Sequence, residues 1–588
     1  MQINMFLNDN IKALIAAKAP VAAWLAQLGT DPTQVYERVF RNKVNLLDWR
    51  MEDGHGLYEK LPPPLLYEAW RPKDKAEGGA TVIVGAGLGY GINHVLTGTP
   101  PSHKILVVEP MPEMLLACLG QTDYRPFIAS GQLSFLPPDP TVVEKAIAGL
   151  DVSFLFSRIN LHSDLACKQM SPLYAQATLM VKAKLESLSV ELSTLRHKQE
   201  VMVGNELHNY ARAMDGGSLV RVQGMARGLT AVVLGAGPSL AKFAPDLLAL
   251  RDRAFFVTAL QTLPALERLG LKPDLCLAID FNPGMVDPIN NLHDRAFAAD
   301  IPFIYSTKMN PAVMDGYPGP MIPLWTQGGI GTFVLKDQEL VLDAGGNVGV
   351  TLVRFLSWAG AKRFILVGQD FAWQGATTHA AGHHSAARPH TFCPREDVKL
   401  KNLYGEEIFT HLGFLAAKRD IEKDIAATKI PVYNLYGGGI VIRGATNIDM
   451  AALRDQNLIA SEGSKEAFLD ALHRAARPRV RPIFTPRAPQ WAMSLKNVGH
   501  RLDKLFRKAD KHQQEIRHIL SQILVFLKQD PLYLPYLYNE IMDIAGLVQT
   551  HAHYGVKELT IFKDVKKRVL RKIKEMDETF THSRDWAA

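Results

Sequence analysis

The most specific chemical signal in the sequence is the turn Gly235-Ala236-Gly237-Pro238-Ser239-Leu240, which follows a short apolar run. Glycines 235 and 237 let the backbone approach a phosphate closely, and the start of the following helix attracts the same group through its N–H groups. Pro238 fits a first helical turn, where its missing N–H costs nothing, and Ser239 adds a hydroxyl donor. Because Leu240 replaces the third glycine of the dinucleotide fingerprint, the turn predicts a mononucleotide such as CMP.

Polar residues follow three other apolar runs of the chain. They are Asp280 in LCLAIDFNP, Ser306 and Thr307 in FIYSTK, and Gln369 and Asp370 in ILVGQDF. Each of them could cap the next helix. Ligands of open α/β sheets bind at the carboxyl ends of the strands, however, so a cluster of such residues opposite a phosphate turn predicts a binding site.

A loop rich in histidine follows Asp370. Its polar members are Thr378, His379, His383, His384, His390 and Cys393. Their spacing fits no structural zinc pattern, so the sequence predicts no metal. An imidazole titrates near neutral pH and can act as a general base. The candidate bases are Asp280, His379 and His411, with His379 preferred and His411 also readable as a surface residue near a helix start; Asp370 is a further catalytic candidate.

A second glycine-rich turn lies near the N-terminus. Gly85, Gly87 and Gly89 follow the strand pattern TVIVG, and Glu109 ends the next strand pattern. The spacing is similar to the GxGxG turn of S-adenosylmethionine-dependent methyltransferases, in which an acid such as Glu109 would hold ribose hydroxyls. The alternative, slightly favoured, is that these glycines only permit a tight turn between a strand and a helix.

Strands that alternate with helices must position these residues. Apolar runs at 231–235, 253–258, 275–280, 303–306, 364–367 and 432–435 predict a Rossmann-like parallel sheet covered by helices on both faces. Runs at 80–85, 104–109 and 151–156 predict a smaller α/β sheet before it, and a long helical pattern covers 172–214. The predicted domains are an N-terminal helical segment (1–75), a Rossmann-like domain (76–200), a central catalytic domain (205–480) and a C-terminal helical domain (490–588), with an Arg- and Pro-rich linker, RPRVRPIFTPRAPQ, before the last.

The composition is that of a soluble globular protein of several domains. The chain has 588 residues, 47% hydrophobic and 21% charged, with a net charge of +7 that favours an anionic ligand or partner without choosing one. Four widely spaced cysteines predict reduced thiols. No signal peptide and no membrane span are predicted, so the expected location is the cytoplasm. A basic amphipathic stretch, KELTIFKDVKKRVLRKIKEMDE, is either a docking face or a solvated helix.

The segments GAGPSL, PDLCLAIDFNP, ILVGQDFAWQGATTHAAG and VYNLYGGGIVIRGA, in this order, resemble the bacterial motility accessory factor (Maf) family. The resemblance covers residues 205–455, and the N- and C-terminal regions fit the long members. The core also resembles bacterial sialyltransferases that use CMP-sialic acid. Tyr436 and Gly437 stand where the family more often has a threonine–glutamate pair. The resemblance implies ligand roles for Asn434 and, ahead of it, for the backbone of Gly437, Gly438 and Gly439.

The resemblance implies a protein O-glycosyltransferase that moves a nonulosonic acid, of the pseudaminic or legionaminic type, from a CMP-sugar to flagellin for flagellum assembly and motility. The reaction would be inverting and would need no metal or other cofactor, and no nucleic acid is implied as a partner. Three alternatives stay open at this point. They are a methyltransferase acting through the N-terminal turn, an enzyme similar to pterin pyrophosphokinases, and a non-enzymatic flagellin-binding protein.

Overall fold

The computed structural model describes residues 4–60, 62–70, 77–329, 332, 335, 338–345, 347–387, 390–394, 397–478, 500–508, 515–529, 536–551 and 554–582. The chain divides into two compact units. Unit 1 consists of residues 1–197, 500–529 and 537–571, and unit 2 of residues 198–499, 530–536 and 572–588. The predicted linker lies outside the described residues from position 479 onward. The predicted boundaries of four domains stay predictions.

Unit 1 begins with short helices, as expected, and with a small hairpin that the sequence did not predict. The elements are α1 (Leu7–Ala16), α2 (Pro20–Leu28), α3 (Pro32–Arg38), β1 (Val39–Arg41), β2 (Leu47–Trp49) and α4 (Pro63–Tyr67). Strands β1 and β2 pair antiparallel. Buried side chains of this segment, among them Leu57, Tyr58, Tyr67 and Trp70, join the core of the sheet that follows.

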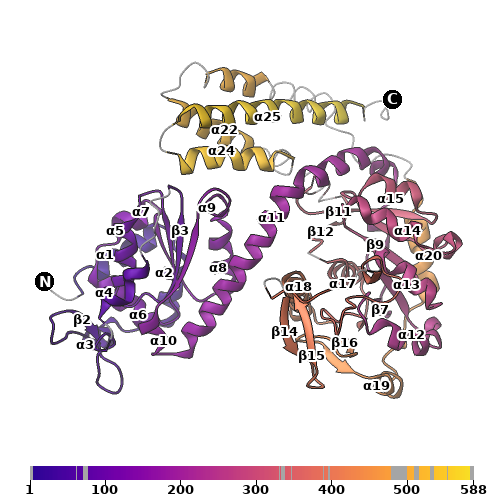
Figure 1. The fold of residues 1–588 in the computed structure, drawn as a ribbon, viewed down its shortest axis with the longest axis horizontal. Coiled ribbons are helices and arrows are strands. Elements are labelled where there is room, and N and C mark those ends of the chain that lie inside the picture. Colours follow the sequence, from indigo (N-terminus) through magenta and orange to yellow (C-terminus); the bar gives the residue numbers. More distant parts are fainter. Residues whose placement is uncertain are drawn as a thin grey trace. The chain divides into compact units, whose positions relative to one another are not determined.

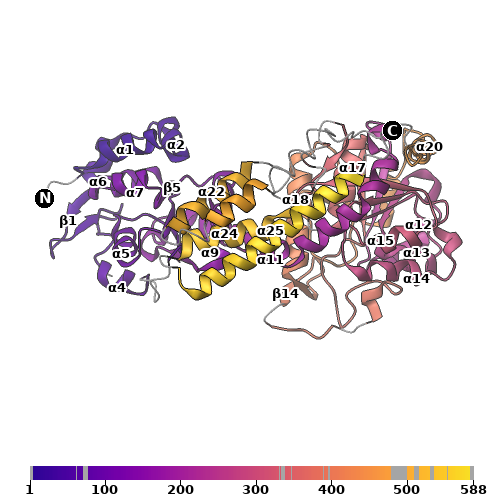
Figure 2. The same ribbon diagram turned by 90° about the horizontal axis from the view of Figure 1, so that it is seen from above.

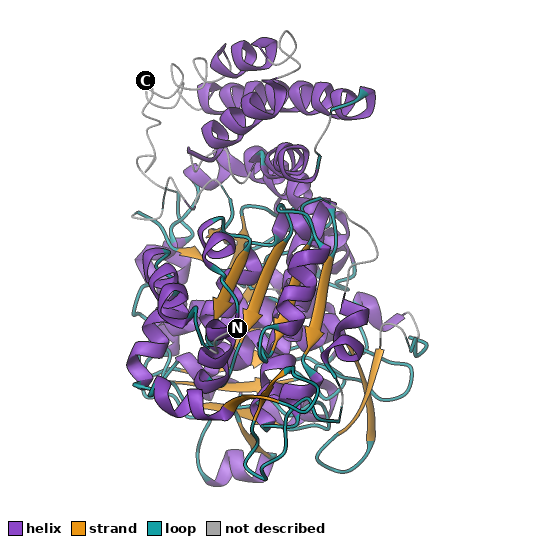
Figure 3. Ribbon diagram, turned by 90° about the vertical axis from the view of Figure 1, so that its left-hand side faces the viewer, coloured by secondary structure: helices purple, strands orange, loops and turns teal. Residues whose placement is uncertain are grey.

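The sheet of unit 1 has four parallel strands in the order β5-β4-β3-β6. These are β3 (Ala80–Val84), β4 (Lys104–Val108), β5 (Leu133–Leu136) and β6 (Ile159–Ser163), with α5 (Tyr90–Gly98), α6 (Pro112–Gln121), α7 (Arg125–Ala129) and α8 (Pro140–Ala148) between them and α10 (Leu165–Lys168) after β6. Figure 3 shows the parallel strands between helices. Strands β3 and β4 are almost fully buried, as their continuous apolar sequences require.

The predicted strand at 151–156 is wrong, because Asp151–Phe156 forms helix α9. A short apolar run has the same pattern in a buried strand and in a buried helix segment. Here the run packs on α24 (Tyr538–Thr550), and a Cβ on Gly546 would lie 2.9 Å from the ring of Phe156. The strand at this place in the sheet is β6 instead, a half-buried edge strand without an apolar run.

The C-terminal region is helical, as predicted. Helix α24 packs against α22 (Ile516–Gln529), and α25 (Val556–His582) lies beside them in Figures 1 and 2. Arg568 of α25 donates to the buried carboxylates of Glu540 and Asp543 on α24. None of the helices in the described part of the chain combines the length and hydrophobicity needed to cross a membrane.

Helix α11 (Pro172–Asp215) has 44 residues and confirms the long helix predicted at 172–214. Figure 1 shows it as one continuous helix. The division between units 1 and 2, at residues 197 and 198, falls within it.

The sheet of unit 2 has nine strands, all parallel, in the order β12-β11-β10-β9-β8-β7-β13-β16-β17. They are β7 (Thr230–Leu234), β8 (Phe255–Ala259), β9 (Leu275–Ala278), β10 (Phe303–Ser306), β11 (Met321–Thr326), β12 (Val341–Leu342), β13 (Arg363–Val367), β16 (Val432–Leu435) and β17 (Thr446–Ile448). The helices around it include α12 (Leu240–Leu248), α13 (Leu263–Arg268), α17 (Val348–Ala359), α18 (Leu412–Ala427), α19 (Met450–Asp455) and α20 (Lys465–Ala475). The predicted fold class, two α/β sheets followed by helices, is confirmed.

The sheet of unit 2 is wider than the sequence predicted. Strands β11, β12 and β17 were not predicted, nor was the antiparallel hairpin of β14 (Asp397–Lys401) and β15 (Glu407–His411). Strand β11 is an apolar run, MIPLWT, but its Pro323 argues against a strand inside a sheet. Strand β12 has only two residues and β17 has the sequence Thr-Asn-Ile, so neither carries the apolar run that marks a buried strand.

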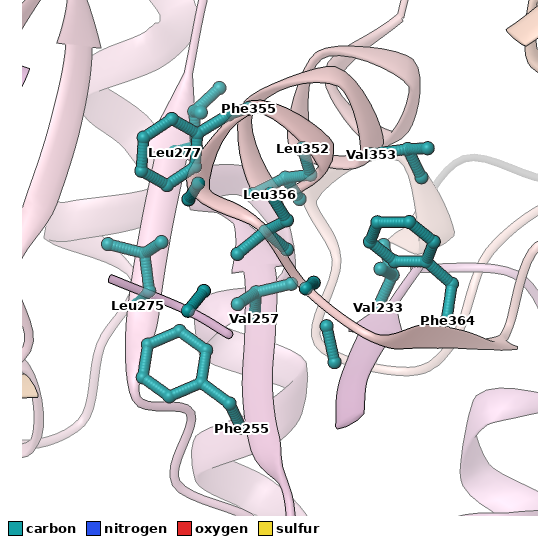
Figure 4. Close-up of a cluster of buried hydrophobic side chains, with 14 of the residues drawn as sticks. Val233, Phe255, Val257, Leu275, Leu277, Leu352, Val353, Phe355, Leu356 and Phe364 are labelled. Carbon is teal, nitrogen blue, oxygen red and sulfur yellow. The ribbon is translucent and has the colours of Figure 1, made fainter. Parts of the chain in front are cut away.

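Helix α17 is the central packing element of unit 2. Its apolar face places Leu352, Phe355 and Leu356 against residues of β7, β8 and β9, including Val233, Val257, Leu275 and Leu277 (Figure 4). Asn347 begins the helix by accepting a hydrogen bond from Gly349 N at 2.7 Å, and Gly360 ends it with a left-handed φ of 96°. The rigid packing of this helix fixes its first turn at one edge of the sheet.

Candidate active site

The candidate site lies where the winding direction of the nine-stranded sheet reverses. The chain enters at β7, continues outward on one side to β12, and returns on the other side of β7 with β13. The carboxyl ends of β7 and β13 are therefore the switch point at which α/β sheets bind ligands. A cavity of about 330 Å³ lies there.

The cavity brings together many of the predicted site residues. It is lined by Gly235 and Gly237 after β7, Asp280 after β9, Gln369 and Asp370 after β13, and Thr378 and His379 of the histidine-rich loop. The predicted meeting of Asp280, the glycine turn and the Gly368–His379 segment at one sheet edge is thus present in the structure. The chemical roles of these residues stay predictions.

The hydrogen bonds of the GAGPSL turn differ from those of a phosphate-binding turn. Gly235 N donates to Val367 O at 2.7 Å and Gly237 N to Gly368 O at 2.9 Å. Ser239 N donates to Asp370 Oδ2 at 2.9 Å. Three amides that were expected to face a phosphate are therefore bonded to β13 and to the residues that follow it.

Asp370 occupies the N-terminus of α12 as a capping carboxylate would. A Cβ on Gly237 would lie 2.2 Å from Asp370 Oδ2, so only glycine permits this approach. Burial raises the pKa of the Asp370 carboxyl, and the hydrogen bonds from Ser239 partly offset that rise. Burial therefore favours the neutral form of the Asp370 carboxyl, whereas the N-terminus of α12 favours its ionised form.

The backbone around Asp370 is strained and firmly held. Phe371, which is buried and lines the cavity, has a φ of 48°, a left-handed conformation that is an outlier for a bulky residue. Thr410 Oγ1 donates to Phe371 O at 2.7 Å, and Ile440 N donates to Asp370 O at 2.9 Å. Backbone strain of this kind persists where the surroundings enforce it, often at functional sites.

The histidine-rich loop contributes a stacked pair of imidazoles. The rings of His379 and His383 lie 4.1 Å apart and nearly parallel, and Thr378 Oγ1 lies 2.8 Å from His379 Nδ1. Ser385 N donates to His383 Nδ1 at 3.1 Å, so a neutral His383 carries its proton on Nε2. His390 instead pairs with Asp397 at 2.8 Å, at the start of β14. In the described part of the chain, no three His, Cys, Asp or Glu side chains are grouped to hold a metal.

Several predicted residues do not line the cavity. Thr307 donates to Glu206 of α11 at 2.7 Å, Ser306 Oγ accepts from Lys308 N, and Asn434 donates to Asn447 at 3.1 Å. The others outside the lining are Pro238, Ser239, Leu240, His411, Gly438 and Gly439. Among the described contacts these residues support the fold.

Two of these outlying residues show why the sequence suggested a site. A Cβ on Gly439 would lie 2.4 Å from the carbonyl oxygen of Asp370, so the glycine packs behind the segment that lines the cavity. His411 is the N-cap of α18, with its Nδ1 accepting from Phe414 N at 3.2 Å. His411 therefore lies at a helix start, as predicted, and its ring is used as a cap.

Sequence reasoning missed part of the lining. Gln261, Thr262 and Phe414 were not predicted. Asn347, Val348, Gly349, His383 and Ser385 lie in the stretch 347–386, which the sequence predicts as one wall of the site, but none of them was given a role there. Gln261 follows β8 as Asp280 follows β9, so the rule that found Asp280 could have found Gln261. The role of Asn347 could have been predicted from its place as the N-cap before the helical pattern of α17.

The N-terminal glycine turn is filled by side chains. Tyr58 OH accepts from Leu88 N at 3.2 Å, and a Cβ on Gly87 would lie 2.4 Å from that hydroxyl oxygen. Glu109 accepts from Ala86 N at 2.6 Å and from Tyr174 OH at 2.7 Å, and burial raises its pKa to about 7. The acid expected to hold ribose is thus fully buried and bonded within the chain.

Comparison with known proteins bears on both regions. Residues 204–376 match the model of the family described as 6-hydroxymethylpterin diphosphokinase MptE-like. A search of curated protein sequences finds no match. The solved structure of the Maf glycosyltransferase from Magnetospirillum magneticum AMB-1 matches 99% of this chain and 96% of its own, with a TM-score of 0.65 and 15% sequence identity.

The chain has the fold of a Maf glycosyltransferase. The resemblance to the Maf family, drawn from four short segments within residues 205–455, is confirmed, and the shared fold extends over nearly the whole chain. The MptE-like match covers β7 to β13 and therefore includes both sides of the switch point. Most of the cavity lining lies within the matched residues, whereas Thr378, His379, His383, Ser385 and Phe414 lie beyond residue 376.

Proposed function

We propose that the chain is a glycosyltransferase that moves a nonulosonic acid, of the pseudaminic or legionaminic type, from its CMP-sugar to Ser or Thr hydroxyls of flagellin in the cytoplasm. The observation that carries the proposal is the Maf fold over 99% of the chain. The cavity at the switch point supports it, because it presents carboxylates and imidazoles in a site large enough for a small polar ligand.

In the proposed reaction, the acceptor hydroxyl oxygen forms a bond to the anomeric carbon as the bond from that carbon to the phosphate oxygen breaks. The electron pair of the broken bond leaves with CMP, and the hydroxyl proton passes to a base. The transition state gains oxocarbenium character at the sugar and negative charge at the phosphate, so a carboxylate near the first and hydrogen-bond donors near the second would lower the barrier.

His379 and Asp280 are the residues we assign as candidate bases. Both line the cavity, whereas His411 caps α18 outside it. In the tautomer whose Nδ1–H donates to Thr378 Oγ1, His379 carries on Nε2 the lone pair that accepts a proton. Asp370 is better placed to order the turn than to take a proton, because its Oδ2 accepts from Ser239 N.

The test is transfer to purified flagellin from CMP-pseudaminic acid or CMP-legionaminic acid, read as the mass of the flagellin product. His379→Ala and Asp280→Asn should each reduce the rate by about 100-fold or more if the residue is the base. The exposed His293, replaced by alanine, is the matched control and should keep the wild-type rate. No transfer by the wild-type protein from either sugar contradicts the proposed function.

The MptE-like match favours a second candidate, transfer of a diphosphate from ATP to a hydroxymethylpterin. The match covers only residues 204–376, whereas the Maf fold accounts for nearly the whole chain. Incubation with ATP, Mg²⁺ and 6-hydroxymethylpterin, followed by detection of AMP, distinguishes the two. AMP release without any sugar transfer would establish the diphosphokinase instead.

A further inference from the structure

The N-terminus of α12 is poorly suited to an anion in this structure. An anion at this helix end would have to bind the turn amides of Gly235, Gly237 and Ser239, and all three amides already donate to acceptors within the chain. The acceptor for Ser239 N is the carboxyl of Asp370, which would repel an anion when it is ionised. A ligand with a phosphate or carboxylate therefore needs another positive region of the cavity.

Helix α17 supplies such a region. It is 12 residues long, has no acidic residue in its first turn, and presents Asn347, Val348 and Gly349 to the cavity. The first N–H groups of a helix have no intrahelical acceptor and carry partial positive charge. Among the described residues, the Asn347 cap satisfies one of these amides, that of Gly349, which donates to Asn347 Oδ1 at 2.7 Å.

The side chain of Gln369 provides independent evidence for a ligand at the same place. It is only 9% exposed, lines the cavity, and has no hydrogen-bond partner among the residues that the structure describes. A Cβ on Gly349 would lie 3.2 Å from both amide atoms of Gln369, and a Cβ on Gly235 would lie 2.6 Å from Nε2. The carboxamide is thus held between the glycine turn and the first turn of α17.

A ligand that accepts the N–H of this carboxamide would give it a hydrogen-bond partner that the described residues do not supply. We propose that the first turn of α17 and the Gln369 carboxamide together bind an oxyanion of the substrate, in place of the GAGPSL turn. The inference rests on the proposed function, in which two groups have this chemistry. They are the phosphate of the nucleotide and the carboxylate of the nonulosonic acid.

The decisive variant is Asn347→Asp. Aspartate caps a helix as well as asparagine does, so the fold and its thermal midpoint should be kept, but the added charge lies where the oxyanion binds. Titration calorimetry with CMP, cytidine and N-acetylneuraminic acid separates the two sources. Affinity should fall by about tenfold or more for CMP if the phosphate is bound, or for the sugar acid if the carboxylate is bound, and stay unchanged for cytidine.

Asn310→Asp is the matched control, because Asn310 caps α15 (Pro311–Gly316) in the same way and does not line the cavity. It should bind all three probes as the wild type does. Gln369→Leu, which removes the carboxamide, should weaken the same probe as Asn347→Asp, by about threefold to tenfold. The inference is overturned if Asn347→Asp loses as much affinity for cytidine as for the other probes, or if it binds every probe as tightly as the wild type does. Neither result would contradict the proposed function. A wild-type protein that binds none of the probes contradicts the proposed function as well.

Discussion

The sheets of units 1 and 2 are wound in the same way around a glycine-rich turn, but side chains fill the turn of unit 1, whereas a cavity lies at the turn of unit 2. In each sheet the turn follows the first strand, which is β3 in unit 1 and β7 in unit 2. The strand that lies on the other side of this first strand, where the winding direction reverses, is β6 in unit 1 and β13 in unit 2. Each returning strand is followed by an aspartate, Asp164 or Asp370, whose carboxyl has a pKa raised by burial. The two crevices therefore share topology and chemistry.

The difference lies in what covers them. In unit 1, Tyr67 OH donates to Asp164 Oδ2 at 2.7 Å and Tyr58 OH accepts from Leu88 N, so side chains of the N-terminal segment occupy the crevice. In unit 2, the corresponding space is the cavity lined by Gln369 and His379. A glycine-rich turn at a switch point thus shows where a site can form, and the covering segment decides whether one does.

The largest expected effect concerns the glycine turn of unit 2. Gly237→Ala places a Cβ 2.2 Å from Asp370 Oδ2 and 2.6 Å from Gly368 O, so the turn and the carboxyl must separate. We expect sugar transfer to fall by about 100-fold. Gly87→Ala in unit 1 meets Tyr58 OH at 2.4 Å and should lower stability while the transfer rate of the folded protein is kept. Equal rates of sugar transfer by Gly237→Ala and the wild type would contradict the conclusion that the glycine turn of unit 2 forms part of the active site.

The next effect is a pH dependence specific to unit 1. Because the pKa of Glu109 is about 7 in the folded state and 4.5 ordinarily, the folded protein binds this proton more tightly. The stabilisation is complete below pH 4.5 and is lost as the pH rises through 7, by about 3 kcal/mol in total. The free energy of unfolding of unit 1, measured with urea at pH 5, 6.5 and 8, should fall as the pH rises. In Glu109→Gln this decrease should be absent. A stability that rises over this range in the wild type relative to Glu109→Gln would contradict the assignment.

A smaller effect is expected on stability when a tyrosine hydroxyl is removed from the crevice of unit 1. Tyr58→Phe removes the hydroxyl that accepts from Leu88 N while it keeps the ring, so we expect a loss of about 1–2 kcal/mol in the free energy of unfolding. Tyr36→Phe, at a half-buried tyrosine of the same segment, is the matched control. Equal stability of Tyr58→Phe and the wild type would show that the hydroxyl fills space without holding the turn.

The smallest effect is an expected absence of binding. Since Tyr58, Tyr67 and Glu109 occupy the N-terminal turn, calorimetric titration of the wild type with S-adenosylmethionine should give no binding heat. Gly87→Val is the control for any heat that does appear. Binding that is present in the wild type and absent in Gly87→Val would revive the methyltransferase alternative and show that the tyrosines move aside.

The sequence predicted the elements that carry strong local patterns. Buried strands such as β3 and β13 are continuous apolar runs, and Asp280 and Asp370 were found because they follow such runs directly. The sequence failed where packing from distant residues decides the outcome. Asp151–Phe156 is a helix because α24 covers it, and no local pattern of DVSFLF records that contact.

The same limit applies to the site. The glycines of GAGPSL were found, but the hydrogen bond from Ser239 N to Asp370 joins residues 131 positions apart and could not be read from the turn. Ser306 was predicted from its place at a strand end and Asn434 from the family resemblance, and both side chains bond to neighbours within the fold. Position at a strand end therefore predicts the edge of the sheet, whereas the direction of each side chain depends on tertiary contacts.

The covering of the N-terminal turn has a practical consequence for shortened forms of the protein. The segment that precedes β3 contributes Leu57, Tyr58, Tyr67 and Trp70 to the core of unit 1, and Trp70 packs closely on Gly91 of α5. A protein that starts at residue 76 would leave that core open to water, with Leu88, Ile92 and other apolar residues on its surface. Such a fragment would self-associate and precipitate, although its Rossmann-like sheet would be complete.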